Sequence, residues 1–399
     1  MSGTAAPSRK QRGVSFFGQA ESFRDVWPLI SGHVEDVFDR GKFSHGRKVA
    51  EFERAMAAYT GARHAIAVNS GTDALILLLR AAGLAPGEGV VVPAFSFVAS
   101  ATSVVLARGR PIFADIDPET YLMDPASVES VVTGRTRAVM PVHLFTQMAD
   151  MDALSAITDR HGLLMVEDSA EAIGMRWNGV HAGLLGTGGV LSFFPTKTLG
   201  ALGDAGMILT DDDETARLAG ILRHHGRMGK TIDHIAGISN LSGISGTNSK
   251  MDDIQAAVLL GKLENLDAQI RRRAELAAAY TERLRDAPGV TRVPVIASRE
   301  ATTNPVFYVY VIEVERRDDL VRHLTEQGIG TEVYYPIPLH LQPCFAELGH
   351  VKGDFPHAER ACERTVALPF YPDMSDADVD LVCDAIGSFY AGHAGRSGT

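Results

Sequence analysis

The sequence predicts an α/β protein with a mainly parallel sheet that helices cover on both faces. Short apolar segments, which are typical of buried strands, alternate with amphipathic or Leu-rich segments, which are typical of helices. This alternation is the pattern of an α/β fold, and ligands in such folds lie at the carboxyl ends of the strands. With 399 residues, of which 45% are hydrophobic, the chain is long enough for a large domain with a smaller companion.

The elements of the first half follow from local composition. Short apolar runs predict strands, and a glycine that follows an apolar periodic segment, as Gly83 does, predicts the end of a helix. The predicted strands are residues 64–69, 90–93, 111–115, 137–143, 163–167 and 206–210. The predicted helices are residues 72–82, 97–108 and 151–161.

The second half has a different order of elements. An Ala- and Leu-rich helical stretch over residues 252–285 is predicted to connect two domains, and its polar later part is predicted to be solvated. A strand at 307–313, a helix at 318–327 and a strand at 330–335 then predict a small α+β domain. We therefore expect an N-terminal arm at 1–30, a large domain at 31–265 and a small domain at 266–399.

Composition excludes several classes of function. The net charge of −11, without a compensating basic tail, argues against nucleic-acid binding. The three cysteines are odd in number and widely spaced, which predicts buried free thiols in a reducing compartment and no metal site. The first residues lack the apolar core of a signal peptide, and no run approaches the length of a membrane span. We expect a cytoplasmic protein that does not bind membranes.

Two residues that follow predicted strands suggest cofactor chemistry. Asp168 follows the strand at 163–167, and Lys197 lies 29 residues later, after another apolar run. A lysine acts as a Schiff-base nucleophile when a pocket positions it, and an acidic partner keeps the ring nitrogen of pyridoxal 5'-phosphate (PLP) protonated. Taken singly, Lys197 reads as a surface lysine and Asp168 as a helix cap. Their joint occurrence favours a PLP site.

A third segment supplies a candidate phosphate site. Ser70, Gly71 and Thr72 stand between a predicted strand and the helix that begins at residue 72. Backbone N–H groups and hydroxyls at a helix N-terminus suit a phosphate dianion. A plain helix cap is the commoner meaning of such a segment. Upstream of Asp168 and Lys197, however, it completes the set of anchors that PLP requires.

These motifs resemble the DegT/DnrJ/EryC1/StrS sugar aminotransferases. The similarity is carried by residues 68–75, 93–99, 167–170, 192–197, 248–257 and 334–343, and it extends over roughly residues 43–371. It implies fold type I of the PLP-dependent transferases, the aspartate aminotransferase-like architecture, and a homodimer with shared active sites. Related sugar dehydratases have histidine in place of Lys197, so the resemblance implies amine transfer.

The resemblance also implies residue roles. Lys197 would hold PLP covalently and move the proton, and Asp168 would pair with the ring nitrogen. Phe97 would stack on the ring, although an ordinary core aromatic is equally compatible with its position. Glu171 stands where many members have Gln or His beside the phenolic oxygen of the cofactor, and we include it in the predicted cofactor site. The predicted phosphate ligands are Ser70, Gly71, Thr72, Ser192 and, from the neighbouring subunit, Asn248.

The implied reaction passes an amine from an amino acid, usually L-glutamate, through PLP to a keto sugar on a nucleoside diphosphate. The diphosphate calls for cations, and a local basic segment includes Arg223, His224, His225, Arg227 and Lys230. A solvated helix end explains most of these residues equally well. The predicted substrate residues are Arg223, His225, Lys250, which stands where many members have Arg, and His340, for which a structural hydrogen bond is the alternative.

The position of amination is predicted from residues 41–53. This segment is closer to members that act at C4 of a 4-keto-6-deoxyhexose, which predicts dTDP-4-keto-6-deoxy-D-glucose as the substrate. A 3-aminotransferase that acts on a dTDP-3-keto-6-deoxyhexose is the alternative. A PLP-binding regulatory protein would share the fold, but it would need a DNA-reading module for which the acidic chain shows no basic segment.

Overall fold

The computed structural model describes residues 13–228 and 241–394. Its larger sheet has seven strands in the order β1-β9-β8-β5-β4-β2-β3, and β9 runs antiparallel to both of its neighbours while the remaining pairs are parallel. The strands are β1 (His64–Val68), β2 (Gly89–Pro93), β3 (Arg110–Ala114), β4 (Thr136–Val139), β5 (Leu164–Asp168), β8 (Gly188–Ser192) and β9 (Gly206–Thr210). The predicted α/β class with a mainly parallel sheet is confirmed.

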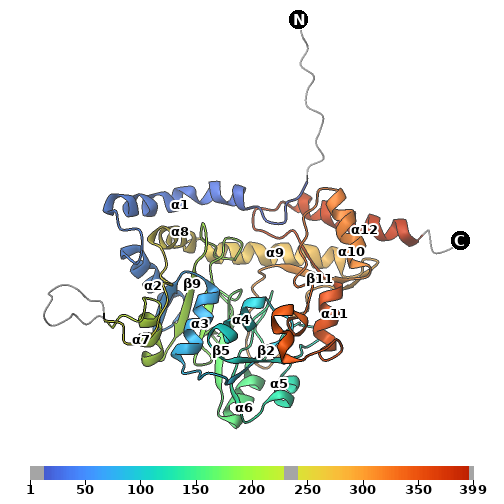
Figure 1. Cartoon of the computed structure of the whole chain (residues 1–399). Coiled ribbons are helices and arrows are strands. Elements are labelled where there is room, and N and C mark those ends of the chain that lie inside the picture. The colour runs from blue at the N-terminus through green and yellow to red at the C-terminus, as the bar shows by residue number, and fades with distance from the viewer. Residues whose placement is uncertain (1–12, 229–240, 395–399) are drawn as a thin grey trace, which may run out of the picture.

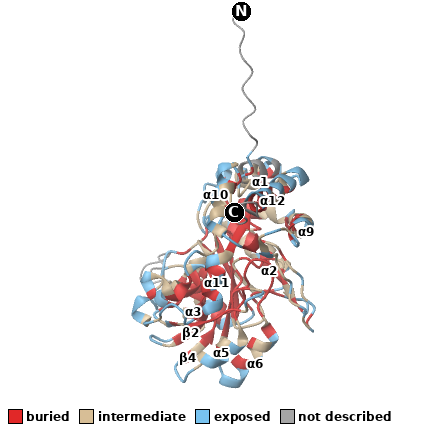
Figure 2. Ribbon diagram, turned by 90° about the vertical axis from the view of Figure 1, so that its right-hand side faces the viewer, coloured by how far each residue is buried: buried red, intermediate tan, exposed pale blue. Residues whose placement is uncertain are grey.

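Helices cover this sheet, and Figure 1 shows α5 and α6 below it while α1, α8 and α9 lie above. Figure 2 shows that buried residues follow the strands through the middle of the molecule. Helices α3 and α4 begin directly after β1 and β2, which places their N-termini at the carboxyl edge of the sheet. The helices of this part are α1 (Gln19–Arg40), α2 (Arg47–Thr60), α3 (Gly71–Ala81), α4 (Val98–Leu106), α5 (Pro125–Val131), α6 (Met151–His161), α7 (Asp213–Leu222) and α8 (Asp253–Leu263).

A smaller antiparallel sheet, β10-β11-β12, forms the second part of the molecule. Its apolar face packs with α9, α10 and α12 around a separate hydrophobic core. The elements are α9 (Leu266–Leu284), β10 (Val290–Arg292), β11 (Tyr310–Val314), α10 (Arg317–Glu326), η1 (Leu339–Leu341), η2 (Pro343–Leu348), α11 (Pro356–Arg364), β12 (Thr365–Leu368) and α12 (Asp376–Ala394), and a two-stranded hairpin, β6 (Arg176–Trp177) and β7 (Val180–His181), belongs to the first part. Among the described residues, none of the helices has the length and apolar content that crossing a membrane requires.

Three predicted elements need correction. The strand predicted at 137–143 ends at Val139, because Pro141 has no N–H to continue the ladder. The helix predicted over 252–285 is two helices, since Asn265 leaves the helical conformation between α8 and α9. The strand predicted at 330–335 was wrong: only Glu332 forms an isolated bridge there.

The domain bounds remain predictions. The large and small sheets agree with a division near residue 265, since α8 packs on α1 and α2 whereas α9 packs on α12. The predicted arm at 1–30 has no break at its end, because α1 is continuous through residue 30. Residues 1–12 lie outside the described residues.

Candidate active site

The predicted cofactor residues come together at the carboxyl edge of the large sheet. Asp168 is the last residue of β5 and Ser192 the last residue of β8, and these two strands are neighbours. Gly71 opens α3, and a β-carbon on Gly71 would lie 3.0 Å from that of Ser192. Lys197 follows β8 by five residues, in a loop whose backbone turns between Phe194 and Lys197.

Lys197 is held by a buried carboxylate. Its Nζ lies 3.0 Å from Glu171 Oε1 and 4.2 Å from the centre of the Tyr308 ring. Glu171 is itself fixed, since the backbone N–H of Phe145 donates to its other oxygen at 2.9 Å. Burial lowers the pKa of Lys197, but the charge of Glu171 and the hydrogen bond to it more than compensate, and the pKa lies above its ordinary value. The amine is therefore positioned and charged.

Asp168 is a buried acid whose hydrogen-bond donors are uncharged. Its side chain accepts from Ser100 Oγ at 2.7 Å and from the N–H of Ala170 at 3.3 Å, and the residue is 4% exposed. Burial raises the pKa of this carboxyl, and the hydrogen bond from Ser100 opposes the shift. Ser100 is in turn hydrogen-bonded to Ser96, one turn earlier. Such a carboxylate is suited to a cationic ligand group, because burial of a charge is costly until a counter-charge meets it.

The segment at the start of α3 forms a cradle lined by backbone. Ser70 Oγ caps the helix by accepting from the N–H of Asp73 at 3.1 Å. Gly206 of β9 lets the chain approach closely, since a β-carbon there would lie 2.3 Å from the carbonyl carbon of Ser70. Ser192 lies against Gly71 on the other side. The helix cap is present, as the simpler interpretation requires, and the two glycines additionally bring the hydroxyl of Ser192 and the N-terminus of α3 close together.

Aromatic side chains border the Lys197 and Asp168 pair. Phe97 precedes α4 and is 56% exposed, which excludes a buried core role for its ring. Its ring centre lies 6.2 Å from that of Tyr335, which also approaches Phe95. The residues predicted as a strand at 330–335 thus direct an aromatic side chain toward the site.

The predicted polar residues at Asn248 and Lys250 lie at the end of β1. Val68 and Lys250 form an isolated bridge, and the N–H of Asn69 donates to Ser249 at 3.0 Å. Lys250 Nζ contacts the side-chain oxygen of Asn248. This segment therefore lies beside the residues of the same chain that lead into the cradle. The role of Asn248 in a neighbouring subunit remains a prediction.

The basic segment is only partly available for a ligand. Arg223 Nη1 donates to Glu53 at 2.5 Å and to the carbonyl of Ala67 at 2.7 Å, so its guanidinium already has a partly buried ion pair. His225 takes a left-handed backbone conformation with φ of 57°. The His224 ring lies 5.7 Å from that of His45, and Lys250 acts on both electrostatically. Lys230 lies outside the described residues.

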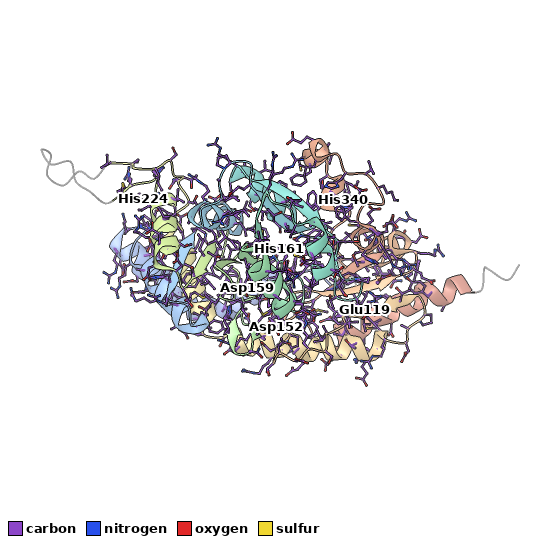
Figure 3. The ribbon with its side chains drawn as sticks, turned by 90° about the horizontal axis from the view of Figure 1, so that it is seen from below. Glu119, Asp152, Asp159, His161, His224 and His340 are labelled. Atoms are coloured by element: carbon purple, nitrogen blue, oxygen red, sulfur yellow. The ribbon has the colours of Figure 1, made fainter. Side chains whose placement is uncertain are left out.

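The structure does not bring His340 to this group. Its ring is 1% exposed, its Nε2 lies 3.1 Å from Glu359, and Phe355 packs against it. Figure 3 shows His340 and His224 on opposite sides of the molecule. These contacts agree with the structural hydrogen bond that was the alternative, while the Nδ1 of His340 is buried without a hydrogen-bond partner. A substrate role for His340 stays a prediction.

Three neighbours of the site were not predicted. Tyr308 lies under Lys197, and nothing in the local sequence marks it. Ser100 holds Asp168, and its only sequence signal is a second serine, Ser96, four residues earlier. Tyr335 stands in a motif that the resemblance included without a role.

These features fit PLP and define a class. The glycine-bounded cradle suits a phosphate, Asp168 suits a protonated ring nitrogen, and Lys197 offers an amine between them. With the mainly parallel sheet and the smaller second sheet, they define a PLP-dependent transferase of fold type I.

Comparison with known proteins gives the family. Residues 29–387 match the DegT/DnrJ/EryC1/StrS aminotransferase family, and the chain belongs to it. It is 43% identical over 378 residues to the "Pleiotropic regulatory protein" of Geobacillus stearothermophilus (94% of this chain, 98% of the relative). It is 37% identical over 373 residues to the dTDP-3-amino-3,4,6-trideoxy-alpha-D-glucose transaminase of Streptomyces venezuelae (94% and 95%).

Solved structures agree. The crystal structure of S. venezuelae DesV with a ketimine intermediate has a TM-score of 0.88 and 36% identity, and the match covers 95% of this chain and 98% of that one. The crystal structure of NtdA from Bacillus subtilis with bound PMP has a TM-score of 0.81 and 30% identity (92% and 82%). The predicted enzyme class and cofactor are confirmed: the chain is a PLP-dependent sugar aminotransferase.

Proposed function

We propose that this protein transfers an amine from an amino acid to the C3 ketone of a dTDP-linked deoxyhexose, with L-glutamate as the amine donor. The observation that supports this class of reaction is the position of the Lys197 amine. It lies 3.0 Å from Glu171 and interacts electrostatically with Asp168. Bound PLP supplies the electron sink that lets an amine exchange between two carbon skeletons. Every other step falls to side chains of this chain.

We assign roles accordingly. Lys197 would hold the cofactor and, once released, would serve as the acid and base that moves the proton; its amine lies 3.0 Å from the carboxylate of Glu171. Asp168 would pair with the ring nitrogen, and Phe97 would offer an exposed ring face for stacking. Ser70, Gly71, Thr72 and Ser192 would hold the phosphate.

Relatives support C3. Two relatives at 37% identity carry the name dTDP-3-amino-3,4,6-trideoxy-alpha-D-glucose transaminase. Two others, at 35% and 36%, are named as aminotransferases of 3-oxo or 3-dehydro UDP-sugars. Amination at C4 was predicted from the segment at 41–53. In this segment the ring of His45 lies beside the ring of His224, in the basic segment that was predicted to bind the substrate. Amination at C4 therefore stays the alternative outcome.

The test is the position of the new amine. The purified enzyme is incubated with L-glutamate and either dTDP-3-keto-6-deoxyglucose or dTDP-4-keto-6-deoxyglucose, and NMR locates nitrogen in the product. We expect conversion of the 3-keto sugar. Amination of the 4-keto sugar alone would establish the C4 alternative, and reaction with neither would reject both sugars.

We further propose a homodimer with shared sites. Large apolar side chains are exposed at Trp27, Phe38, Phe43, Phe194 and Leu202, with exposed fractions of 49% to 63%. Phe194 and Leu202 flank the Lys197 loop, so an interface that covers them would bring a second chain to the site. Sedimentation equilibrium is the measurement, and a monomer at micromolar concentration would contradict it.

A further inference from the structure

A concave region lies against the Lys197 loop and is lined by three cationic side chains, Lys197, Lys262 and Arg273. This cavity of about 220 Å³ is lined by residues of the loop at 195–202, by Phe17 and Phe23, by Lys262 of α8, and by Arg273 of α9. We call it the lysine-loop cavity. Its described lining contains Lys197 but none of Glu171, Asp168, Phe97 or Ser192, so it is distinct from the cofactor cradle.

Of these three cations, Lys262 and Arg273 have neutral partners, whereas Lys197 is paired with Glu171. Lys262 Nζ donates to the carbonyl of Gly200 at 2.5 Å, and its ammonium lies 5.6 Å from the centre of the Phe23 ring. Arg273 is 5% exposed, and its Nη1 donates to the carbonyl of Tyr308 at 3.0 Å. Among the described residues that line the cavity, none is Asp or Glu. Asp373 acts on Arg273 electrostatically from outside this lining.

Two buried polar atoms of residues that line this cavity have no hydrogen-bond partner. Arg273 Nε and the Thr198 hydroxyl are buried without a hydrogen-bond partner, and both residues line the cavity. Buried polar groups of this kind are normally satisfied by a partner. Burial, and after it the nearby Arg273, lowers the pKa of Lys262 to about 8.

We propose that the lysine-loop cavity binds a small oxyanion, a carboxylate or a tetrahedral oxyanion of the size of sulfate. Two cations without a carboxylate attract such a ligand, and the planar guanidinium of Arg273 matches two oxygens at once. The volume corresponds to about seven water molecules, enough for the anion and part of its hydration. This inference rests on the cavity and not on the proposed sugar substrate.

The bound anion would contact the two cations, Lys262 and Arg273, that hold backbone groups next to Lys197. Lys262 holds the carbonyl of Gly200 at the end of the lysine loop. Arg273 holds the carbonyl of Tyr308, whose ring lies 4.2 Å below the Lys197 ammonium. Binding of an anion to these two cations would therefore affect the position of Lys197.

The test is calorimetric titration of the PLP-loaded enzyme with sodium sulfate and, separately, with sodium acetate. PLP occupies the phosphate cradle, so that place is closed to the probe. We expect saturable binding of one anion per chain, and the tighter of the two probes identifies the oxyanion type. Lys262→Met should weaken binding by at least about tenfold. Lys352→Met, an exposed lysine paired with Glu363, removes the same charge and should bind as the wild type does.

Gln269→Glu tests the same cavity without removing a lysine, should Lys262→Met fold poorly. Gln269 lines the cavity one turn before Arg273 on α9, so Gln269→Glu places a carboxylate beside the guanidinium. This variant should no longer bind sulfate or acetate, and its thermal midpoint without added anion should rise by about 2 °C. Absence of saturable binding to the wild type, or unchanged affinity in either cavity variant, would overturn the proposal.

Discussion

Glu171→Gln should make the cofactor-free protein load PLP faster. A protonated lysine is not a nucleophile, and Glu171, by its charge and its hydrogen bond, raises the pKa of Lys197, as Tyr308 and Asp168 also do. Glutamine keeps the shape of the side chain and can still accept from the N–H of Phe145. The substitution therefore removes charge and leaves the loop in place.

The magnitude follows from the distance of 3.0 Å between Lys197 Nζ and Glu171 Oε1. At an effective dielectric constant of about 20, two unit charges at this separation attract by about 5 kcal/mol. Loss of even a third of that attraction changes the fraction of uncharged amine by at least about tenfold. We expect at least this increase in the loading rate at neutral pH.

Stopped-flow absorbance after mixing with PLP measures the rate, at several PLP concentrations so that binding and covalent loading separate. Glu282→Gln, the same substitution at an exposed position of α9, should load at the wild-type rate. A Glu171→Gln rate equal to or below that of the wild type would show that Glu171 does not hold the amine in its charged form.

Further predictions concern stability, the cradle and the dimer. Burial lowers the pKa of His181 to about 4. The neutral ring therefore contributes its full share to the free energy of unfolding above about pH 6.5, and up to about 3 kcal/mol is lost as the pH falls from there through 4. Urea unfolding should show this loss in the wild type and not in His181→Gln. Gly206→Ala puts a carbon 2.3 Å from the carbonyl carbon of Ser70 and should weaken PLP binding at least about tenfold, with wild-type affinity as the contradicting result. If sites are shared, inactive Lys197→Ala and impaired Asn248→Ala chains should regain activity when mixed, whereas activity no greater than the sum of the two would count against sharing.

Local sequence was sufficient for the elements whose composition agrees with their environment. The helix predicted at 151–161 coincides with α6, because Asp150 caps it by accepting from the N–H of Ala153 and Gly162 ends it in the left-handed conformation. The strand predicted at 206–210 coincides with β9, a wholly buried apolar run. In both, local propensity and tertiary packing favour the same structure.

The prediction failed where a distant contact decides the conformation. The segment at 330–335, which ends in two tyrosines, has strand composition, yet Tyr335 packs against Phe95 and Phe97 of the large part, and the segment forms no strand. His340 stands in a family motif, and only the fold shows that Glu359 and Phe355 enclose it.

For the site, the sequence by itself determined the chemical types: a lysine, an acid and a glycine-hydroxyl segment, each after a strand. That was possible because the carboxyl ends of neighbouring parallel strands meet at one edge, so position along a strand implies position in space. The tertiary structure alone decided which groups set their charges. Glu171, Ser100 and Tyr308 act on Lys197 or Asp168 across separations of 26 to 111 residues, and electrostatic effects depend on distance and burial, which no local pattern encodes.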